Sequence, residues 1–439
     1  MRIVMGVTFS VILLHSTEEN SLMATRSNPA APSTPNYTIP FLIVTALFCI
    51  FGFLTNLNSN LSPKLEQIFH LSHAWSNLVT SSWFFAYLIF AVPSAKVIEK
   101  VGYKKTMVIS LFVMVAGALL FVPAAGAVSF PFFLAASFIL ATGVCGLQTA
   151  ANPYVSILGP EHSAPARLTM AQAFNSLGTA VAPLVVGAFI LSDPGKLQDQ
   201  AAVAHTVVRP YILIAIALLV LGFLVMAMHL PAITATREFR PAKGGDPLLE
   251  RSIWTYRHTV LAMVGIFLYV GLEVSLFANA IKFFEAQGIS NNDTAALLAS
   301  FYPLAMMIGR FAGTFVMKVV KAERLLVILG LFGIALLFVG MSASGQLAIW
   351  CLILCGLANS IMYPTIFALG IAELGPMTSK GSGVITIGNV GGAVMPPLFG
   401  LVADLTHTYR FSFLLPIVGY LFIVYYGFAG YKPRRGAAA

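Results

Sequence analysis

Residues 130–160 read FPFFLAASFILATGVCGLQTAANPYVSILGP. The stretch is apolar over a length that lets one helix cross a bilayer, which takes about 20 residues. Its interior nevertheless carries Gln148, Asn152 and Pro153. Polar side chains are costly in hydrocarbon, and proline removes a helical hydrogen bond. The stretch therefore predicts a membrane-spanning helix whose polar residues line a cavity rather than face lipid.

The composition of the whole chain is that of a membrane protein. Of its 439 residues, 58% are hydrophobic and only 9% are charged, whereas a soluble protein carries about 25% charged residues. Long apolar runs recur along the chain without the alternating pattern of barrel strands, so helices are the expected spanning elements. We predict an all-α membrane protein that crosses the bilayer several times.

Charged, proline-rich and glycine-rich breaks divide the chain into twelve predicted spans. The spans run over residues 39–69, 74–99, 104–124, 129–158, 167–192, 207–230, 258–287, 292–318, 323–343, 345–373, 380–404 and 409–431. The longest polar interval has six spans on either side. This predicts a leader (1–38), an N-terminal six-helix bundle (39–230), a cytoplasmic linker (231–257), a C-terminal six-helix bundle (258–431) and a tail (432–439).

The two halves contain related segments. QTAANPYVSILG at 148–159 aligns with NSIMYPTIFALG at 359–370, which places Gln148 on Asn359 and aligns Pro153 with Pro364. NSLGTAVAPL at 175–184 aligns with NVGGAVMPPL at 389–398. Similar offsets indicate a parallel duplication, so we predict two six-helix pseudo-repeats.

The distribution of positive charge orients the chain. The formal net charge is +9, but most Lys and Arg residues fall in alternate loops and at the termini. This asymmetry follows the positive-inside rule and predicts that both termini are cytoplasmic. The charge therefore needs no nucleic acid as partner. The four cysteines all fall in spans and suit packing, so we expect no metal or other cofactor.

Polar residues inside the spans cluster at helical spacing on narrow faces. Amides offer hydrogen-bond donors and acceptors together, as hydroxyl groups do, so a set of amides with few charges suits a neutral polyhydroxyl ligand. The alternative is that they join helices, at about 0.6 kcal/mol each. We favour ligand contact for the matched pair Gln148 and Asn359. The candidate binding residues are Asn56, Gln148, Asn152, Gln172, Asn175, Asn359 and Tyr363.

Several longer motifs together carry a resemblance to a known family. The motifs are FGFLTNLNSNLSPKLEQIF (51–69), LQTAANPYVSILGPE (147–161), RLTMAQAFNSLG (167–178), FLYVGLEVS (267–275), IGRFAGTF (308–315) and YPTIFALGIAELG (363–375). They resemble the fucose–galactose–glucose:proton symporters of the major facilitator superfamily. The resemblance covers about residues 39–430 and implies the major facilitator fold, a monosaccharide substrate and alternating access. It also implies that Asn56, Gln172 and Asn175 line the sugar cavity.

Two positions depart from the family pattern. Where a fucose carrier of this family has an aspartate and a glutamate, this chain has Ser59 and Gln148. Glutamine at 148 resembles the glucose and galactose branch. Neither side chain titrates near neutral pH, so the family's proton route is in question.

Coupling to a cation then depends on other residues. Glu273 is the acidic residue nearest the middle of a span, and Arg310 is a base at comparable depth on the next span. Paired with Arg310, Glu273 would stay ionised; alone in a dry pocket, it would exchange a proton. An ionised Glu273 would also suit sodium. Glu273 itself and Asn279, nearer the outer surface, are further candidate substrate contacts.

These observations predict a secondary transporter for a neutral hexose in a bacterial inner membrane, acting as a monomer by alternating access. Coupling to a proton or sodium, or no coupling, stays open. An efflux antiporter for lipophilic cations and a non-transporting sugar sensor are the alternatives. We do not expect an enzyme, because the sequence shows no nucleophile–base set and no phosphate-binding loop.

Overall fold

The structure is a computed structural model that describes residues 37–69, 73–190, 208–233, 252–289 and 291–433. All regular elements in these ranges are helices, which confirms the predicted all-α class. The described residues from Pro40 onward belong to one compact unit. Most of the predicted leader, linker and tail lies outside the described residues, so the domain boundaries stay predictions.

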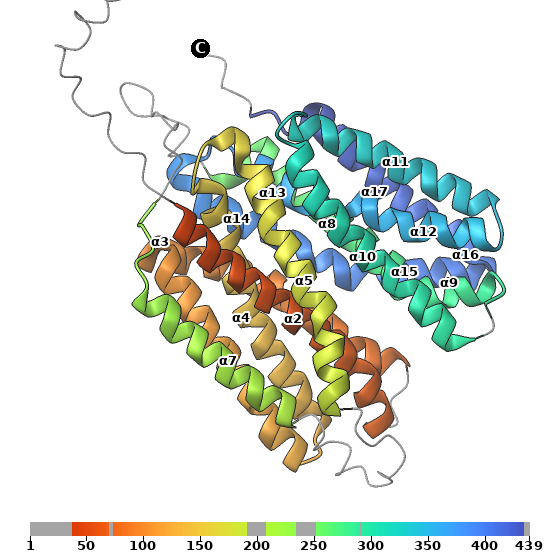
Figure 1. Ribbon diagram of the computed structural model, residues 1–439, viewed down its shortest axis with the longest axis horizontal. Coiled ribbons are helices and arrows are strands. Elements are labelled where there is room, and N and C mark those ends of the chain that lie inside the picture. The colour runs from red at the N-terminus through yellow and green to blue at the C-terminus, as the bar shows by residue number, and fades with distance from the viewer. Residues whose placement is uncertain (1–36, 70–72, 191–207, 234–251, 290, 434–439) are drawn as a thin grey trace, which may run out of the picture. The chain divides into compact units, whose positions relative to one another are not determined.

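The first half of the chain forms five helices within the described residues, which Figure 1 colours from red to green. α3 packs along α4 and α7. It contains two predicted spans, 74–99 and 104–124, and its backbone leaves the helical conformation between them at Gly102 (φ 81°, ψ 168°), a region that glycine enters without steric cost. The helices are α2 (Thr38–Phe69), α3 (His73–Gly126), α4 (Phe130–Ile157), α5 (Ala164–Ile190) and α7 (Val208–Ala227).

The second half contains shorter helices, because four of its six predicted spans are interrupted. The seventh span breaks at Asn279, the tenth near Ser360, the eleventh at a 3₁₀ turn and the twelfth near Phe413. The helices are α8 (Arg257–Ala278), α9 (Ala280–Ala286), α10 (Asn292–Val316), α11 (Ala322–Ser342), α12 (Gln346–Asn359), α13 (Met362–Gly370), α14 (Thr378–Ile387), α15 (Gly391–Thr406), α16 (Tyr409–Ser412) and α17 (Leu414–Tyr425).

The described residues include nine helical segments long and apolar enough to cross a membrane. One of them, in α3, holds two predicted spans, and α5 and α10 cover the other two predicted spans. Large apolar side chains stay exposed on these helices; Val220 and Phe223 on α7 are 62% and 51% exposed. Apolar surface of this extent is unfavourable in water and suits contact with lipid. The helices therefore agree with the twelve predicted spans.

The prolines of α4 and α13 each leave one backbone carbonyl without its helical donor. A helical carbonyl normally accepts from the N–H four residues later, and proline has no N–H. Pro153 thus frees the oxygen of Thr149, which accepts from Ser382 Oγ of α14 at 2.6 Å. Pro364 frees the oxygen of Ser360, which accepts from Arg310 Nε of α10 at 3.2 Å. The matched prolines therefore create matched acceptors.

In two helix pairs, a glycine of one helix lets its backbone contact the backbone of the other. A Cβ atom on Gly178 of α5 would lie 1.8 Å from the carbonyl oxygen of Cys49 in α2. A Cβ atom on Gly391 of α15 would lie 1.9 Å from that of Phe267 in α8. The first pair joins predicted spans one and five, and the second joins spans seven and eleven. The contacts thus follow the predicted pseudo-repeat.

Candidate substrate site

The polar centre of the site begins on α4. Gln148 and Asn152 lie one helical turn apart and are buried, with 7% and 0% of their surface exposed. Gln148 Oε1 and Asn152 Oδ1 have no hydrogen-bond partner among the described residues. A buried polar atom without a partner costs about 1–3 kcal/mol. Two such acceptors on one helix face therefore indicate a place for a ligand that donates hydrogen bonds.

Tyr363 of α13 joins these amides to the second half of the chain. Its hydroxyl accepts from Asn152 Nδ2 at 3.4 Å and from Asn389 Nδ2 at 3.5 Å. Its ring stacks on Phe367 at a centroid distance of 6.2 Å and lies 6.2 Å from the ring of Tyr269. The structure thus brings the predicted residues Asn152 and Tyr363 into contact.

Asn359 lies at the position that matches Gln148, but its amide is engaged at both ends. Its Nδ2 donates to the Tyr302 hydroxyl at 2.6 Å, and its Oδ1 accepts from the Tyr420 hydroxyl at 2.7 Å. Its backbone oxygen accepts from the Tyr269 hydroxyl at 3.2 Å. In this conformation Asn359 joins α10, α12 and α17. That it contacts substrate stays a prediction.

Of the predicted residues on α2 and α5, Asn175 makes a contact between those two helices. Asn175 is half-buried and donates from Nδ2 to the Phe48 oxygen at 3.2 Å. Gln172 is 3% exposed, and Asn56 on α2 is half-buried. The side chain of Ser59 lies outside the part of the chain that the structure describes. That these three amides share a cavity with those of α4 stays a prediction.

The predicted coupling residues lie near each other without forming an ion pair. Both are described, and no side-chain nitrogen–oxygen distance within 4.0 Å joins Glu273 to Arg310. Glu273 lies within electrostatic range of Arg310 and Tyr269. Asn279, at the end of α8, donates to the Ser275 oxygen of its own helix at 2.9 Å. Its contact with substrate stays a prediction.

Arg310 has other partners that the sequence did not reveal. The residue is 6% exposed. Its Nη1 donates to the backbone oxygen of Gln172 at 3.1 Å and to Ser176 Oγ, both on α5. Its hydrogen-bond partners among the described residues are neutral oxygens, so none of the described carboxylates directly neutralises the buried guanidinium.

Polar contacts between α2–α7 and α8–α17 gather toward one end of the helices. That end holds the C-terminus of α4, the N-terminus of α5 and the link from α13 to α14. Pairs of residues there close the gap between the two sets of helices. The pairs at that end are Asn152–Tyr363, Thr149–Ser382, Glu161–Glu373 and Glu99–Lys380. A further pair, Ser176–Arg310, joins the two sets nearer the middle of α5.

Sequence reasoning did not predict that tyrosine hydroxyls bond the Asn359 amide, and it did not select Asn389. Tyr269, Tyr302 and Tyr420 are each at most 1% exposed. In the sequence each is a tyrosine within an apolar span. Tyrosine is also common at membrane interfaces, so this signal is not specific to a binding site. Asn389 had a stronger signal, because it aligns with Asn175 in the repeat.

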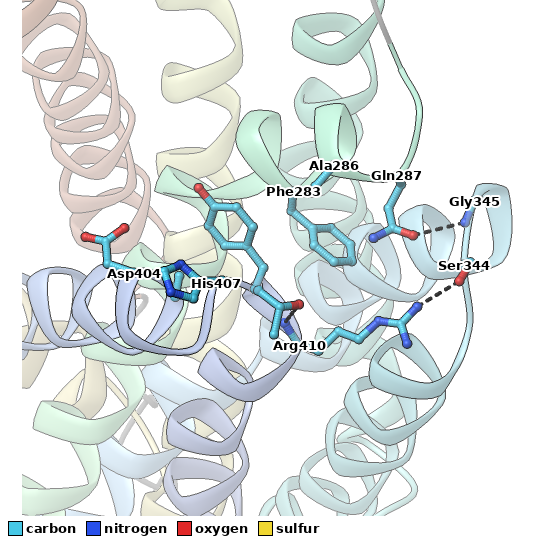
Figure 2. Close-up of a pocket in the computed structure, with 11 residues that line it drawn as sticks. Phe283, Ala286, Gln287, Ser344, Gly345, Asp404, His407 and Arg410 are labelled. Carbon is cyan, nitrogen blue, oxygen red and sulfur yellow. Dashed lines mark hydrogen bonds between the residues drawn. The ribbon is translucent and has the colours of Figure 1, made fainter.

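A separate pocket of about 450 Å³ opens at the opposite end of the helices (Figure 2). Its walls come from α9, the loop before α12, and the connection between α15 and α16. Arg410 donates to Ser344 Oγ at 2.8 Å, and the Gly345 N–H donates to Gln287 Oε1 at 3.0 Å. None of the predicted binding residues lines this pocket, so cavity size alone would not have located the amides.

Comparison with known proteins agrees with this geometry. The model of the Major Facilitator Superfamily matches residues 43–389. The glucose/galactose transporter of Brucella abortus is 40% identical over 91% of this chain and 96% of its own length. The L-fucose-proton symporter of Escherichia coli is 32% identical over 92% of this chain and 95% of its own.

A solved structure is similar over nearly the same range. It is that of the transporter FucP in the outward conformation, with a TM-score of 0.79 and 31% identity over 90% of this chain and 99% of that one. These relatives are transporters by name, which confirms the prediction of a transporter rather than an enzyme. The fold, the length of the match and the level of identity agree: this chain belongs to the Major Facilitator Superfamily.

Proposed function

We propose that this protein is a secondary transporter that moves a neutral hexose of the glucose, galactose or fucose class by alternating access. The observation that carries this proposal is the pair of buried, unpartnered oxygens, Gln148 Oε1 and Asn152 Oδ1, beside the Tyr363 hydroxyl within the described residues. The names of the relatives, a glucose/galactose transporter and an L-fucose-proton symporter, support the same substrate class.

The site suits a ligand with several hydroxyl groups. Hydroxyl protons of a sugar would donate to the two amide oxygens, and the amide nitrogens would donate to sugar oxygens. Each bond contributes only about 1 kcal/mol net, so several bonds select a sugar while still allowing its release. The ring of Tyr363 and the neighbouring ring of Phe367 offer apolar faces to the carbon skeleton.

The carrier would sit in a bacterial inner membrane with both termini in the cytoplasm, as the distribution of Lys and Arg predicts. Most polar contacts between α2–α7 and α8–α17 lie toward one end of the helices. At that end α8 begins at Arg257, and the last described helical segment ends at Gly430. We infer a conformation closed to the cytoplasm. Coupling to a proton or sodium would use Glu273, and the carrier would act as a monomer.

Uptake into proteoliposomes tests the function directly. Labelled glucose, galactose and fucose would be offered with an imposed proton gradient, an imposed sodium gradient, or neither. We expect saturable uptake of at least one hexose and accumulation only with the coupling ion. Uptake of none of the hexoses, or inhibition by lipophilic cations with no effect of sugar, would contradict the proposal and favour an efflux antiporter.

Replacement of Gln148 tests the amide site. In Gln148→Ala we expect hexose affinity to fall by about tenfold or more, which corresponds to about 1.4 kcal/mol. Thermal stability should hold, because Oε1 has no partner to lose among the described residues. Isothermal calorimetry and thermal unfolding in detergent measure the two effects. Gln346→Ala, at an exposed position on α12, is the control. Unchanged affinity in Gln148→Ala would show that this amide is a packing residue.

A further inference from the structure

Arg310 is a buried cation that crosses between the two sets of helices. It lies on α10, and its Nη1 reaches the Gln172 oxygen and Ser176 Oγ of α5. Its Nε reaches the Ser360 oxygen, which Pro364 leaves free, within its own set. A guanidinium stays charged under all physiological conditions, so its burial depends on keeping enough oxygen partners.

The partners on α5 depend on the conformation. If α5 and α10 separate, Arg310 keeps Ser360 but loses both α5 oxygens. A buried charge that loses its partners is strongly unfavourable, so Arg310 then needs a replacement acceptor. In the present conformation no described carboxylate lies within 4.0 Å of the guanidinium. An alternative acceptor must therefore come from a group that is near but not yet bonded.

Glu273 is an anionic group that meets this requirement. It lies on α8, within electrostatic range of Arg310, and belongs to the same set of helices, so it stays near Arg310 when α5 departs. Titratable groups within its electrostatic range include Tyr269 of its own helix, Tyr302 of α10 and Tyr363 of α13. Tyr363 contacts the amides of the substrate site, which connects the carboxylate to that site.

We propose that Arg310 is a switch residue, which exchanges the Gln172 and Ser176 oxygens of α5 for the Glu273 carboxylate when the helices separate. An ionised Glu273 attracts Arg310 away from α5 and favours the separated state. A neutral Glu273 leaves Arg310 on α5 and favours the state seen here. The switch thus converts the charge of Glu273 into a conformational preference, and this role rests on the proposed carrier function.

Distance measurement by electron paramagnetic resonance tests the switch in liposomes. Spin labels would be placed at His162 and Val319, two exposed positions at the closed end, in a background with the four native cysteines replaced. Without sugar, we expect Glu273→Gln to raise the ratio of the short-distance to the long-distance population by about fivefold, at the lower end of common coupling effects. Ser176→Ala should lower that ratio.

Two further variants make the test specific. Thr169→Val is the matched control for Ser176→Ala, because Thr169 is buried on the same helix and its hydroxyl donates within α5, to Pro165 at 2.7 Å. It should leave the ratio unchanged. In an Arg310→Gln background, Glu273→Gln should leave the ratio unchanged, because the cation that the Glu273 carboxylate attracts has been removed. An undiminished effect of Glu273→Gln there would overturn the switch.

The outcomes separate the switch from the carrier function. If Glu273→Gln and Ser176→Ala leave both populations unchanged while labelled hexose still enters liposomes, the switch is wrong and the carrier stands. If the populations shift as expected while no hexose is transported, the switch is supported and the substrate assignment is wrong. Should Arg310→Gln not fold, Ser176→Ala and Glu273→Gln still decide whether the switch exists.

Discussion

At the scale of single residues, two matched amides have different surroundings. Gln148 and Asn359 occupy equivalent positions in the repeat, yet Gln148 Oε1 has no partner among the described residues while both ends of the Asn359 amide bond tyrosines. The alignment predicted equal roles. The difference arises from Tyr302 of α10 and Tyr420 of α17. No local sequence pattern around Asn359 predicts that these two residues contact it.

Asn359 should therefore matter for stability. In Asn359→Ala the buried hydroxyls of Tyr302 and Tyr420 lose an amide partner, at about 1–3 kcal/mol for each group left unpaired. We expect a clearly lower melting temperature, measured by fluorescence-detected thermal unfolding. Asn279→Ala is the matched control, since that amide is half-buried and donates to Ser275 of its own helix. Equal melting temperatures in the two variants would contradict a joining role for Asn359.

At the scale of helices, proline and glycine determine how the elements contact each other. Pro153 and Pro364 expose carbonyls that accept from Ser382 and Arg310. Gly178 and Gly391 let helices approach to backbone distance, as small residues do at membrane helix interfaces. Proline and glycine positions were visible in the sequence, but the residues that use them come from distant spans.

Substitution of glycine in α15 tests the close approach. In Gly391→Ala the new methyl group would lie 1.9 Å from the Phe267 oxygen of α8, so the helices must move apart. We expect a large loss of folded protein, read as the monodisperse fraction in size-exclusion chromatography. Gly400→Ala on the same helix is the control, because a Cβ there meets no described atom within 4 Å. It should be neutral or stabilising by up to about 1 kcal/mol. Similar losses in both variants would rule out the contact as the cause.

At the scale of the whole molecule, the contacts between α2–α7 and α8–α17 define one conformational state. The Glu161 carboxylate accepts from the Glu373 N–H at 2.6 Å, and Lys380 lies 3.9 Å from Glu99. The Lys380 and Glu99 side chains are 49% and 33% exposed. Exposed ion pairs of this kind contribute about 0–1 kcal/mol, so the closed end can open at modest cost.

Crosslinking tests whether this opening is required for transport. A Glu161→Cys, Glu373→Cys variant in the cysteine-replaced background should form a disulfide or accept a short crosslinker. Because the link holds the two sets of helices together, hexose flux should fall to background while hexose binding persists. A reducing agent should restore flux in the same sample. Undiminished flux in the fully crosslinked protein would show that this end does not open during transport.

The sequence alone predicts the helical class, the twelve spans, the repeat and the amides of α4. Those features follow from local hydropathy, spacing and turn chemistry, which act within one segment. The folded chain was needed to show which amides are hydrogen-bonded, that Arg310 bonds α5 rather than Glu273, and that Asn389 contacts Tyr363. Such pairings join residues far apart in the chain, and their energies depend on helix packing that no single segment encodes.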